Sequence, residues 1–290
     1  MFKLACFTDE ISQDLATAIA VCKEYELDGV EIRSVWDKPP QELSDDDVAR
    51  IKDMLGEAGL ATCCIASPFF KCDLGNEAEY EEHLRILRRC IWMGQQLGTN
   101  IVRGFTFWKK GPLTDEVFQQ ILEAYKEPVN ILASEGAILG IENEASTYLG
   151  AAHEVKRFID ALGSEHVRAI WDPCNELFAE NGETPYPDGY SHIKNDIVHV
   201  HIKDAGPGEN GELTCLRIGD GLIDYPGQFQ ALIDDGYEGY ASLETHWRPK
   251  ALTKEQVDRP GGAAYSENAE QASRQCLDRI KEILASLRSG

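Results

Sequence analysis

The sequence is poor in positive charge. Lys and Arg together number 28 against 50 Asp and Glu, which gives a formal net charge of −22 over 290 residues. Binding to phosphates needs clustered Lys and Arg, so duplex nucleic acid and an anionic membrane surface are poor partners for this chain. Solvated helix faces account for most of the excess acid. We therefore expect no nucleic-acid partner and no membrane partner.

Long apolar runs are also missing. No stretch approaches the ~20 apolar residues of a membrane span, and Asp9 and Glu10 come too early for the apolar region of a signal peptide. The nine Cys are an odd number without a CxxC pair, and several lie inside apolar runs. This pattern favours reduced thiols over a disulfide framework or a zinc cage. These absences predict a cytoplasmic protein.

Short apolar runs alternate with longer amphipathic stretches along the whole chain. The eight runs expected to form strands are 3–8, 29–33, 60–67, 100–107, 137–143, 167–172, 197–204 and 240–245. The stretches expected to form helices are one that begins at the cap Ser12, then 44–58, 77–97, 114–135, 151–162, a weaker one within 189–195, 225–235 and 267–287. Such alternation predicts βαβ units and a parallel sheet.

Eight βαβ units close more naturally into a barrel than into an open sheet. A (β/α)8 barrel needs about 250 residues, and the turn after the first strand, 8–12, lacks the glycines of a dinucleotide-binding fold. Pro128 predicts a kink or break inside the fourth helical stretch. The sequence thus predicts the α/β class and one (β/α)8 TIM barrel domain over 1–290.

Ionisable side chains stand at the carboxyl ends of the last four predicted strands, where barrels of this kind place their catalytic residues. In chain order they are Glu142 with Asn143 and Glu144, Asp172, His199 with His201, and Glu244. Inside an apolar barrel such groups need pairing or a metal ion. A mixed carboxylate and imidazole shell suits Mn2+, Mg2+, Co2+ or Zn2+, and the share of carboxylates favours Mn2+. The alternative is a set of solvated polar groups at strand ends.

Four segments around these residues resemble the signature stretches of the xylose isomerase-like TIM-barrel superfamily of sugar and sugar-phosphate isomerases and epimerases. The segments are 141–144, 171–175, 199–204 and 242–246. The superfamily also holds ketose 3-epimerases, inosose-processing enzymes and endonuclease IV, and the resemblance runs essentially end to end. It implies four ligands to one divalent metal ion, namely Glu142, Asp172, His201 and Glu244. It also implies that Glu142 and Glu244 act as the acid/base pair.

The resemblance and the residue types together predict a metal-dependent isomerase or epimerase of a sugar, a sugar phosphate or a polyol ketone. Removal of a proton beside a carbonyl leaves an enediolate, which the ion stabilises. The proposed base is Glu142 and the proposed acid is Glu244, in an order that depends on the substrate. The alternative is a lyase or dehydratase that uses the same site to expel water from an inosose or the aglycone from a 3-keto glycoside. A DNA endonuclease is opposed by the charge of −22 and by only seven His, and a non-catalytic sugar-binding barrel is a further alternative.

Seven further side chains are candidates for binding the substrate. They are Asn175, His199, Lys203, Arg217, Glu144, Trp108 and His246. By the resemblance, Asn175 stands where the ketose 3-epimerases tend to carry a substrate-binding histidine, and Glu144 stands where many relatives have histidine. Both departures oppose a ketose 3-epimerase, and the one at 175 favours the lyase alternative. His199 has the alternative role of a buried, hydrogen-bonded imidazole below the site, and Lys203 that of an ion-pair partner of Glu244 or Asp172.

Further residues near the predicted barrel mouth leave structural alternatives open. Glu31 and Arg33 at the end of the second strand form an internal ion pair or bind substrate, and Arg103 is a candidate anion-binding residue. An aromatic wall for the ligand, with a barrel cap or a subunit contact as its alternatives, is predicted from Trp36, Phe69, Phe70, Phe107, Trp108 and Trp247. By resemblance alone, the partners are a small carbohydrate or polyol and further copies of the chain in a homo-oligomer, a dimer or a tetramer.

Overall fold

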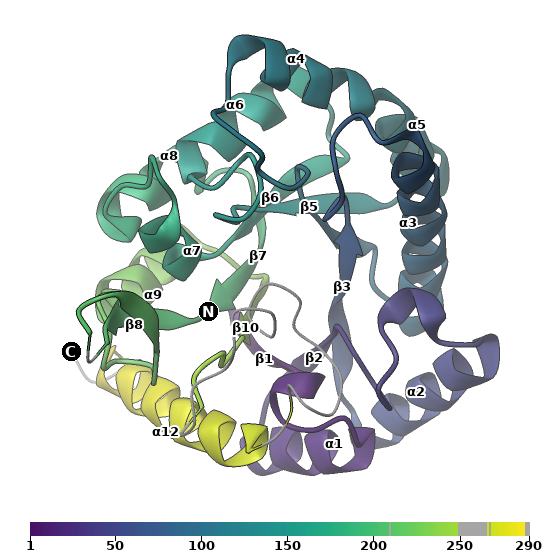
Figure 1. The fold of residues 1–290 in the computed structure, drawn as a ribbon. Coiled ribbons are helices and arrows are strands. Elements are labelled where there is room, and N and C mark those ends of the chain that lie inside the picture. Colours follow the sequence, from purple (N-terminus) through teal and green to yellow (C-terminus); the bar gives the residue numbers. More distant parts are fainter. Residues whose placement is uncertain (209, 249–265, 267, 288–290) are drawn as a thin grey trace.

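Eight parallel strands close into a barrel in the computed structural model, which describes residues 1–208, 210–248, 266 and 268–287. Around the barrel the strands follow one another in chain order, and the last of them pairs with the first (Figure 1). The strands are β1 (Lys3–Phe7), β2 (Gly29–Ile32), β3 (Ala61–Phe69), β4 (Ile101–Gly104), β5 (Ile138–Glu142), β6 (Val167–Trp171), β7 (Ile197–Ile202) and β10 (Tyr240–Leu243). This closed sheet confirms the predicted (β/α)8 TIM barrel.

Helices cover the outside of the barrel (Figure 1). They are α1 (Leu15–Glu24), α2 (Asp45–Ala58), α3 (Glu77–Leu97), α4 (Asp115–Ala124), α5 (Lys126–Glu135), α6 (Ala152–Leu162), α7 (Pro173–Phe178), α8 (Tyr190–Ile193), α9 (Tyr225–Asp234) and α12 (Ala269–Leu287). Short turns of other helix types occur at η1 (Thr8–Glu10), η2 (Pro40–Glu42) and η3 (Pro185–Gly189). Residue 267, the predicted start of the last helix, lies outside the described residues.

Side chains and glycines at the helix ends explain most helix boundaries. Ser44 caps α2 through a reciprocal capping box with Asp47, and the Thr114 side chain caps α4. Gly59 ends α2 with φ 71°, a conformation in which a side chain would be strained. The predicted cap of α1 was wrong, because Asp14 caps that helix by accepting from the Thr17 amide.

The fourth helical stretch divides at a different residue from the one predicted. Helices α4 and α5 meet at Tyr125, whereas the expected break was Pro128. Pro128 falls in the first turn of α5, where a missing N–H removes no helical hydrogen bond. The strand predicted for 100–107 also ends earlier, since β4 stops at Gly104.

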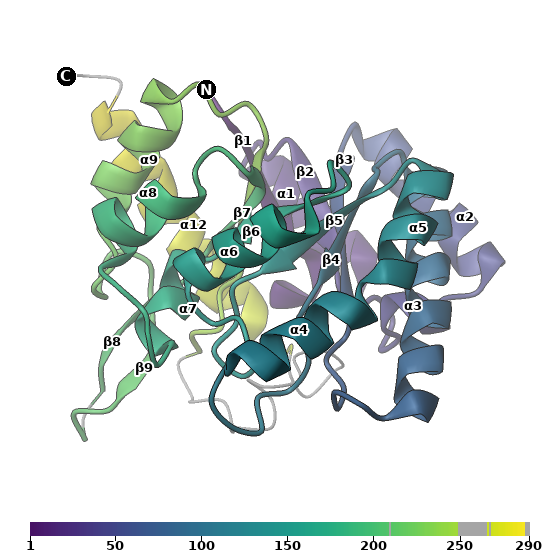
Figure 2. The same ribbon diagram turned by 90° about the horizontal axis from the view of Figure 1, so that it is seen from above.

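Two elements had no counterpart in the prediction. The short helix α7 follows β6 directly, capped by Asp172 with Pro173 in its first turn. The loop after β7 contains an antiparallel hairpin of β8 (Asp204–Pro207) and β9 (Leu213–Leu216). The hairpin projects from the end of the barrel opposite the N-terminus, which is the end where the strands finish (Figure 2).

Membrane insertion finds no support in the helices that the structure describes. None of them combines the length and the apolar content that crossing a bilayer takes. The nine cysteines are free thiols, as predicted, and all except Cys215 are buried.

Gly140 in β5 sits where the barrel wall leaves no room for a side chain. A Cβ atom there would lie 2.5 Å from Cγ1 and 2.8 Å from Cδ1 of Ile170. We expect Gly140→Ala to lower the free energy of unfolding by about 1–3 kcal/mol through this overpacking. Chemical denaturation monitored by circular dichroism measures the change.

The matched control is Gly56→Ala on the exposed side of α2, where a Cβ atom meets nothing within 4 Å. Alanine favours the helix over glycine, so this variant should be more stable than wild type by about 0.5–1 kcal/mol. Equal effects of the two substitutions would contradict the packing argument.

Candidate metal centre

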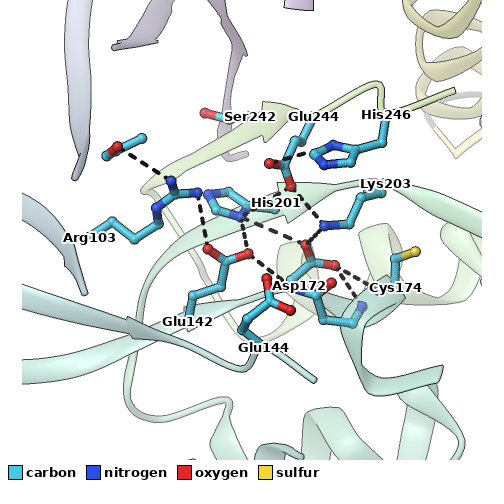
Figure 3. Close-up of polar contacts among 12 residues, drawn as sticks. Arg103, Glu142, Glu144, Asp172, Cys174, His201, Lys203, Ser242, Glu244 and His246 are labelled. Carbon is cyan, nitrogen blue, oxygen red and sulfur yellow. Dashed lines mark hydrogen bonds and ion pairs between the residues drawn. The ribbon is translucent and has the colours of Figure 1, made fainter. Parts of the chain in front are cut away.

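Four ionisable side chains meet at the carboxyl ends of the last four barrel strands. Glu142 is the last residue of β5, Asp172 directly follows β6, His201 lies in β7 and Glu244 directly follows β10. All four are buried, and each offers one ligand atom that lies within 4.8 Å of the other three. Figure 3 shows their side chains turned toward one another. The structure thus brings together the four residues singled out in the sequence, referred to below as the four-residue cluster.

One nitrogen of His201 faces the three carboxylates. Its Nδ1 atom lies 3.2 Å from Glu142 Oε1, 3.8 Å from Asp172 Oδ2 and 4.0 Å from Glu244 Oε2. Carboxylate oxygens and one imidazole nitrogen therefore surround a common point. Such a donor set could hold a divalent cation.

Three basic side chains neutralise the carboxylates of the four-residue cluster. Arg33 Nη1 lies 2.7 Å from Glu244 Oε1, and Arg103 Nη1 lies 3.1 Å from Glu142 Oε2. Lys203 Nζ lies 2.8 Å from Glu244 Oε2. Each glutamate thus turns one oxygen toward the centre of the cluster and the other toward an arginine.

Burial and these charges act on the pKa values in opposite directions. Burial by itself would raise the pKa of Glu142, but the charges of His201 and Arg103 outweigh it and bring the pKa to about 2. Burial would lower the pKa of His201, yet Glu142 and Glu31 raise it to about 10. For Asp172 burial is the larger effect and raises the pKa. The imidazolium and the ionised glutamates therefore stabilise one another.

A second buried layer lies beneath the four-residue cluster. Glu31 Oε2 lies 2.7 Å from His199 Nε2, and Glu31 Oε1 lies 3.4 Å from His201 Nε2. Ser242 Oγ lies 3.0 Å from the same nitrogen of His199. Glu31 holds the Nε2 side of His201, which leaves Nδ1 turned toward the carboxylates.

The residues at the end of β2 form internal ion pairs, but not with each other. Glu31 pairs with the two histidines, whereas Arg33 pairs with Asp9, Glu10 and Glu244. Two sequence separations are large, because Glu31 and His199 are 168 residues apart and Arg33 and Glu244 are 211 apart. No short motif could have signalled these contacts.

Two cavities flank the four-residue cluster. The smaller, of about 160 Å³, is lined by four of the predicted substrate-binding residues. These four are Asn175, Lys203, Glu144 and His246. The larger, of about 560 Å³, is lined by Arg33, Arg103, Lys71 and Trp108 among others.

The remaining two substrate candidates lie elsewhere. His199 is fully buried in the layer below the cluster. Arg217 points its guanidinium at Asp220, with Nε 3.0 Å from Oδ2. Within the described part of the chain, no recorded contact joins Arg217 to the four-residue cluster.

The predicted aromatic wall was wrong for its three phenylalanines. Phe69, Phe70 and Phe107 are at most 1% exposed and stack on one another, with ring centroids 3.9 and 4.2 Å apart. All three rings pack against Tyr125 in the core. Burying their apolar surface there is more favourable than exposing it at the mouth of the barrel. Trp108 is the member of the predicted wall that lines the larger cavity.

The chain is similar in sequence and fold to known proteins. A family model described as a xylose isomerase-like TIM barrel matches residues 19–284. An inosose dehydratase of Klebsiella pneumoniae is 25% identical over 252 residues, which cover 79% of this chain and 82% of that protein.

Two solved structures share the fold over nearly their whole length. The structure of an IOLI protein with a zinc atom has a TM-score of 0.74 at 18% identity and covers 98% of this chain and 99% of its own. The structure of D-allulose 3-epimerase from Methylomonas sp. in complex with D-allulose has a TM-score of 0.72 at 18% identity and covers 97% and 96%.

The contacts of Glu31 generate a prediction on stability. Although burial opposes it, His199 and His201 hold the pKa of Glu31 well below its usual range. Removing this charge leaves His199 without a carboxylate partner and His201 without the one on its Nε2 side, so Glu31→Gln should lower the free energy of unfolding by about 3–5 kcal/mol at pH 7. Urea denaturation measures the loss, and Glu57→Gln on the exposed side of α2 serves as the control.

The same residue should shape the acid limb of the stability curve. Because the folded pKa of Glu31 lies below its unfolded value of about 4.3, its contribution is present above that pH and is lost as the pH falls toward the folded pKa. The wild type should therefore lose stability more steeply than Glu31→Gln below about pH 4.3. Parallel curves for the two proteins would refute the assignment.

Proposed function

The chain belongs to the xylose isomerase-like TIM barrel family, and we propose that it is a metal-dependent enzyme acting on a polyhydroxylated ketone. In the proposed reaction a proton is removed beside the carbonyl and a neighbouring hydroxyl then leaves as water. The observation that carries this proposal is the buried convergence of Glu142, Asp172, His201 and Glu244 at the strand ends.

A divalent ion fits the residues that are present. Asp172 Oδ1 accepts from the amides of Cys174 and Asn175, which leaves the buried Oδ2 to face Lys203 Nζ at 2.8 Å and His201 Nδ1 at 3.8 Å. This second oxygen is therefore not used by the helix cap and is turned toward the other ligand atoms of the four-residue cluster. The carboxylate-rich donor set favours Mn2+ over Mg2+, Co2+ or Zn2+. When bound, such an ion supplies a Lewis acid for the carbonyl oxygen.

The two glutamates supply the proton transfers in this proposal. They approach the cluster from opposite sides (Figure 3), each with one oxygen held by an arginine. Glu142 takes the proton from carbon, and the electron pair of that C–H bond forms the new double bond as the C–O bond breaks. Glu244, which is ionised at rest, takes up a proton from solvent and gives it to the departing hydroxyl, while Glu142 passes its proton to solvent, so that water leaves. Asn175 Nδ2 donates to Glu142 Oε1 at 3.0 Å and keeps that carboxylate in place.

Substrate binding is assigned to the smaller cavity. Lys203, Glu144, Asn175 and His246 present polar groups to it, which suits the hydroxyl groups of a polyol. Trp108 lines the larger cavity and would contact a second part of a longer substrate. The homo-oligomer and the cytoplasmic location remain predictions.

Loss of water is ranked before epimerisation because of the names of the relatives and because of one residue in the site. Curated relatives with the name inosose dehydratase support loss of water, as does Asn175 in place of a histidine. Epimerisation is the second candidate, because two opposed glutamates can remove a proton on one face and return it on the other. Both outcomes use the same first step.

An inosose incubated with the Mn2+-loaded protein in D2O tests the proposed reaction. We expect an enone absorbance to appear, and we expect Glu142→Gln to reduce its rate by about 10²–10⁴-fold because the base is gone. Glu180→Gln, at an exposed ion pair with Lys109, is the control and should keep the wild-type rate. Deuterium in the recovered ketone without an enone would favour epimerisation. If no inosose or ketose in a panel gives either an enone or deuterium exchange, the proposal is refuted.

Metal uptake should release a proton from His201. Its pKa of about 10 means that the imidazole is protonated at neutral pH in the metal-free protein, and a ligating imidazole has to be neutral. We expect about one proton released per Mn2+ bound at pH 7.5, and an affinity that rises about tenfold per pH unit below pH 9. A pH-indicator titration in weak buffer counts the protons. An affinity independent of pH would contradict this prediction.

A further inference from the structure

Lys203 is a buried cation placed directly against the four-residue cluster. It follows β7, and its side chain is 6% exposed. Its ammonium Nζ lies 2.8 Å from Asp172 Oδ2 and 2.8 Å from Glu244 Oε2. These are the same two oxygens that face His201 Nδ1. The lysine therefore lies on the oxygens that a metal ion would need.

The ammonium is held by both carboxylates. It donates to Glu244 Oε2 and forms an ion pair with Asp172 Oδ2 at the same distance of 2.8 Å. A divalent ion binds carboxylate oxygens more closely than an ammonium does and carries twice the charge. The two cations repel each other at such short range in a buried site, so an ion on these oxygens weakens the hold of the carboxylates on the ammonium.

The backbone at this position is fixed, while the side chain has room to move. The Lys203 amide donates to Tyr225 Oη at 2.7 Å, and the Tyr225 hydroxyl donates to the Lys203 carbonyl at 2.6 Å. The cavity of about 160 Å³ is lined by Lys203 and Glu144 among others. Glu144 pairs with Lys71 at 3.3 Å, so an ammonium that turned into this cavity would enter a polar site that already holds one ion pair.

We propose that Lys203 competes with the metal ion for Asp172 and Glu244. Once the metal binds, the lysine becomes a contact of the substrate. Its ammonium neutralises Asp172 and Glu244 in the metal-free protein. When a divalent ion takes those oxygens, the ammonium turns into the smaller cavity and donates to a substrate oxygen. This inference rests on the proposed function, since it requires the metal site.

The test compares metal affinity and turnover in chelator-stripped and reloaded proteins. We expect Lys203→Met to bind Mn2+ at least about tenfold more tightly than wild type, because the competing charge is gone. At saturating Mn2+ the same variant should turn over substrate about 10²-fold or more slowly, because the donor to the substrate is gone. Lys203→Arg keeps the charge and should bind Mn2+ no more tightly than wild type. Electron paramagnetic resonance of free Mn2+ gives the affinities.

The controls separate this effect from a general loss of charge or of folding. Lys194→Met removes a lysine that pairs with Asp235 on the surface and should leave both quantities unchanged. Lys203→Gln is a second neutral variant, in case the methionine variant does not fold, and circular dichroism checks both. A structure of the Mn2+-loaded wild type should show Nζ beyond ion-pair distance of Asp172 and inside the smaller cavity.

Each outcome supports or overturns one proposal. Tighter Mn2+ binding together with slower turnover in both neutral variants supports the inference. Unchanged or weaker Mn2+ binding in the neutral variants overturns the inference about Lys203 but leaves the metal site intact. A Mn2+-loaded structure in which Nζ still contacts Asp172 has the same consequence. Failure of wild type and variants alike to bind Mn2+ overturns the metal site itself and, with it, the proposed function.

Discussion

Burial of three carboxylates at one end of an apolar barrel is the constraint on which the rest of this structure depends. An unpaired charge in such a place would cost far more free energy than a domain has to spare. Arg33, Arg103 and Lys203 meet that cost in the metal-free protein, each within 3.1 Å of a carboxylate oxygen. The chemistry of the site and the stability of the barrel therefore depend on the same contacts.

The charges are arranged in layers along the barrel. Glu31 and His199 lie below His201, and Ser242 closes this layer from β10. The contacts in this layer join side chains of β2, β7 and β10, so the layer links these strands as well as orienting His201. Such a second layer holds the candidate ligand His201 in one orientation on the rigid sheet.

Single carboxylates serve both the fold and the site. Asp172 caps α7 with one oxygen and turns the other toward the four-residue cluster. Asp204 accepts from the amides of Ala205, Gly219, Gly221 and Ile223, which holds the long segment after β7 against the barrel. The positions of the segments that follow β6 and β7 thus depend on the hydrogen bonds of Asp172 and Asp204.

The sequence by itself determined the number and order of the barrel strands, most helix ends and the four ionisable residues at the strand ends. Periodicity and capping are local properties, and parallel strands of a barrel all finish at one end, so residues such as Glu142 and Glu244 could be expected to meet. The tertiary structure alone decided which cation pairs with which carboxylate, and it moved Phe70 and Phe107 from the expected ligand wall into the core. Arg33 reaches Glu244 across 211 residues, and such a contact depends on the closure of the barrel, which no local pattern records.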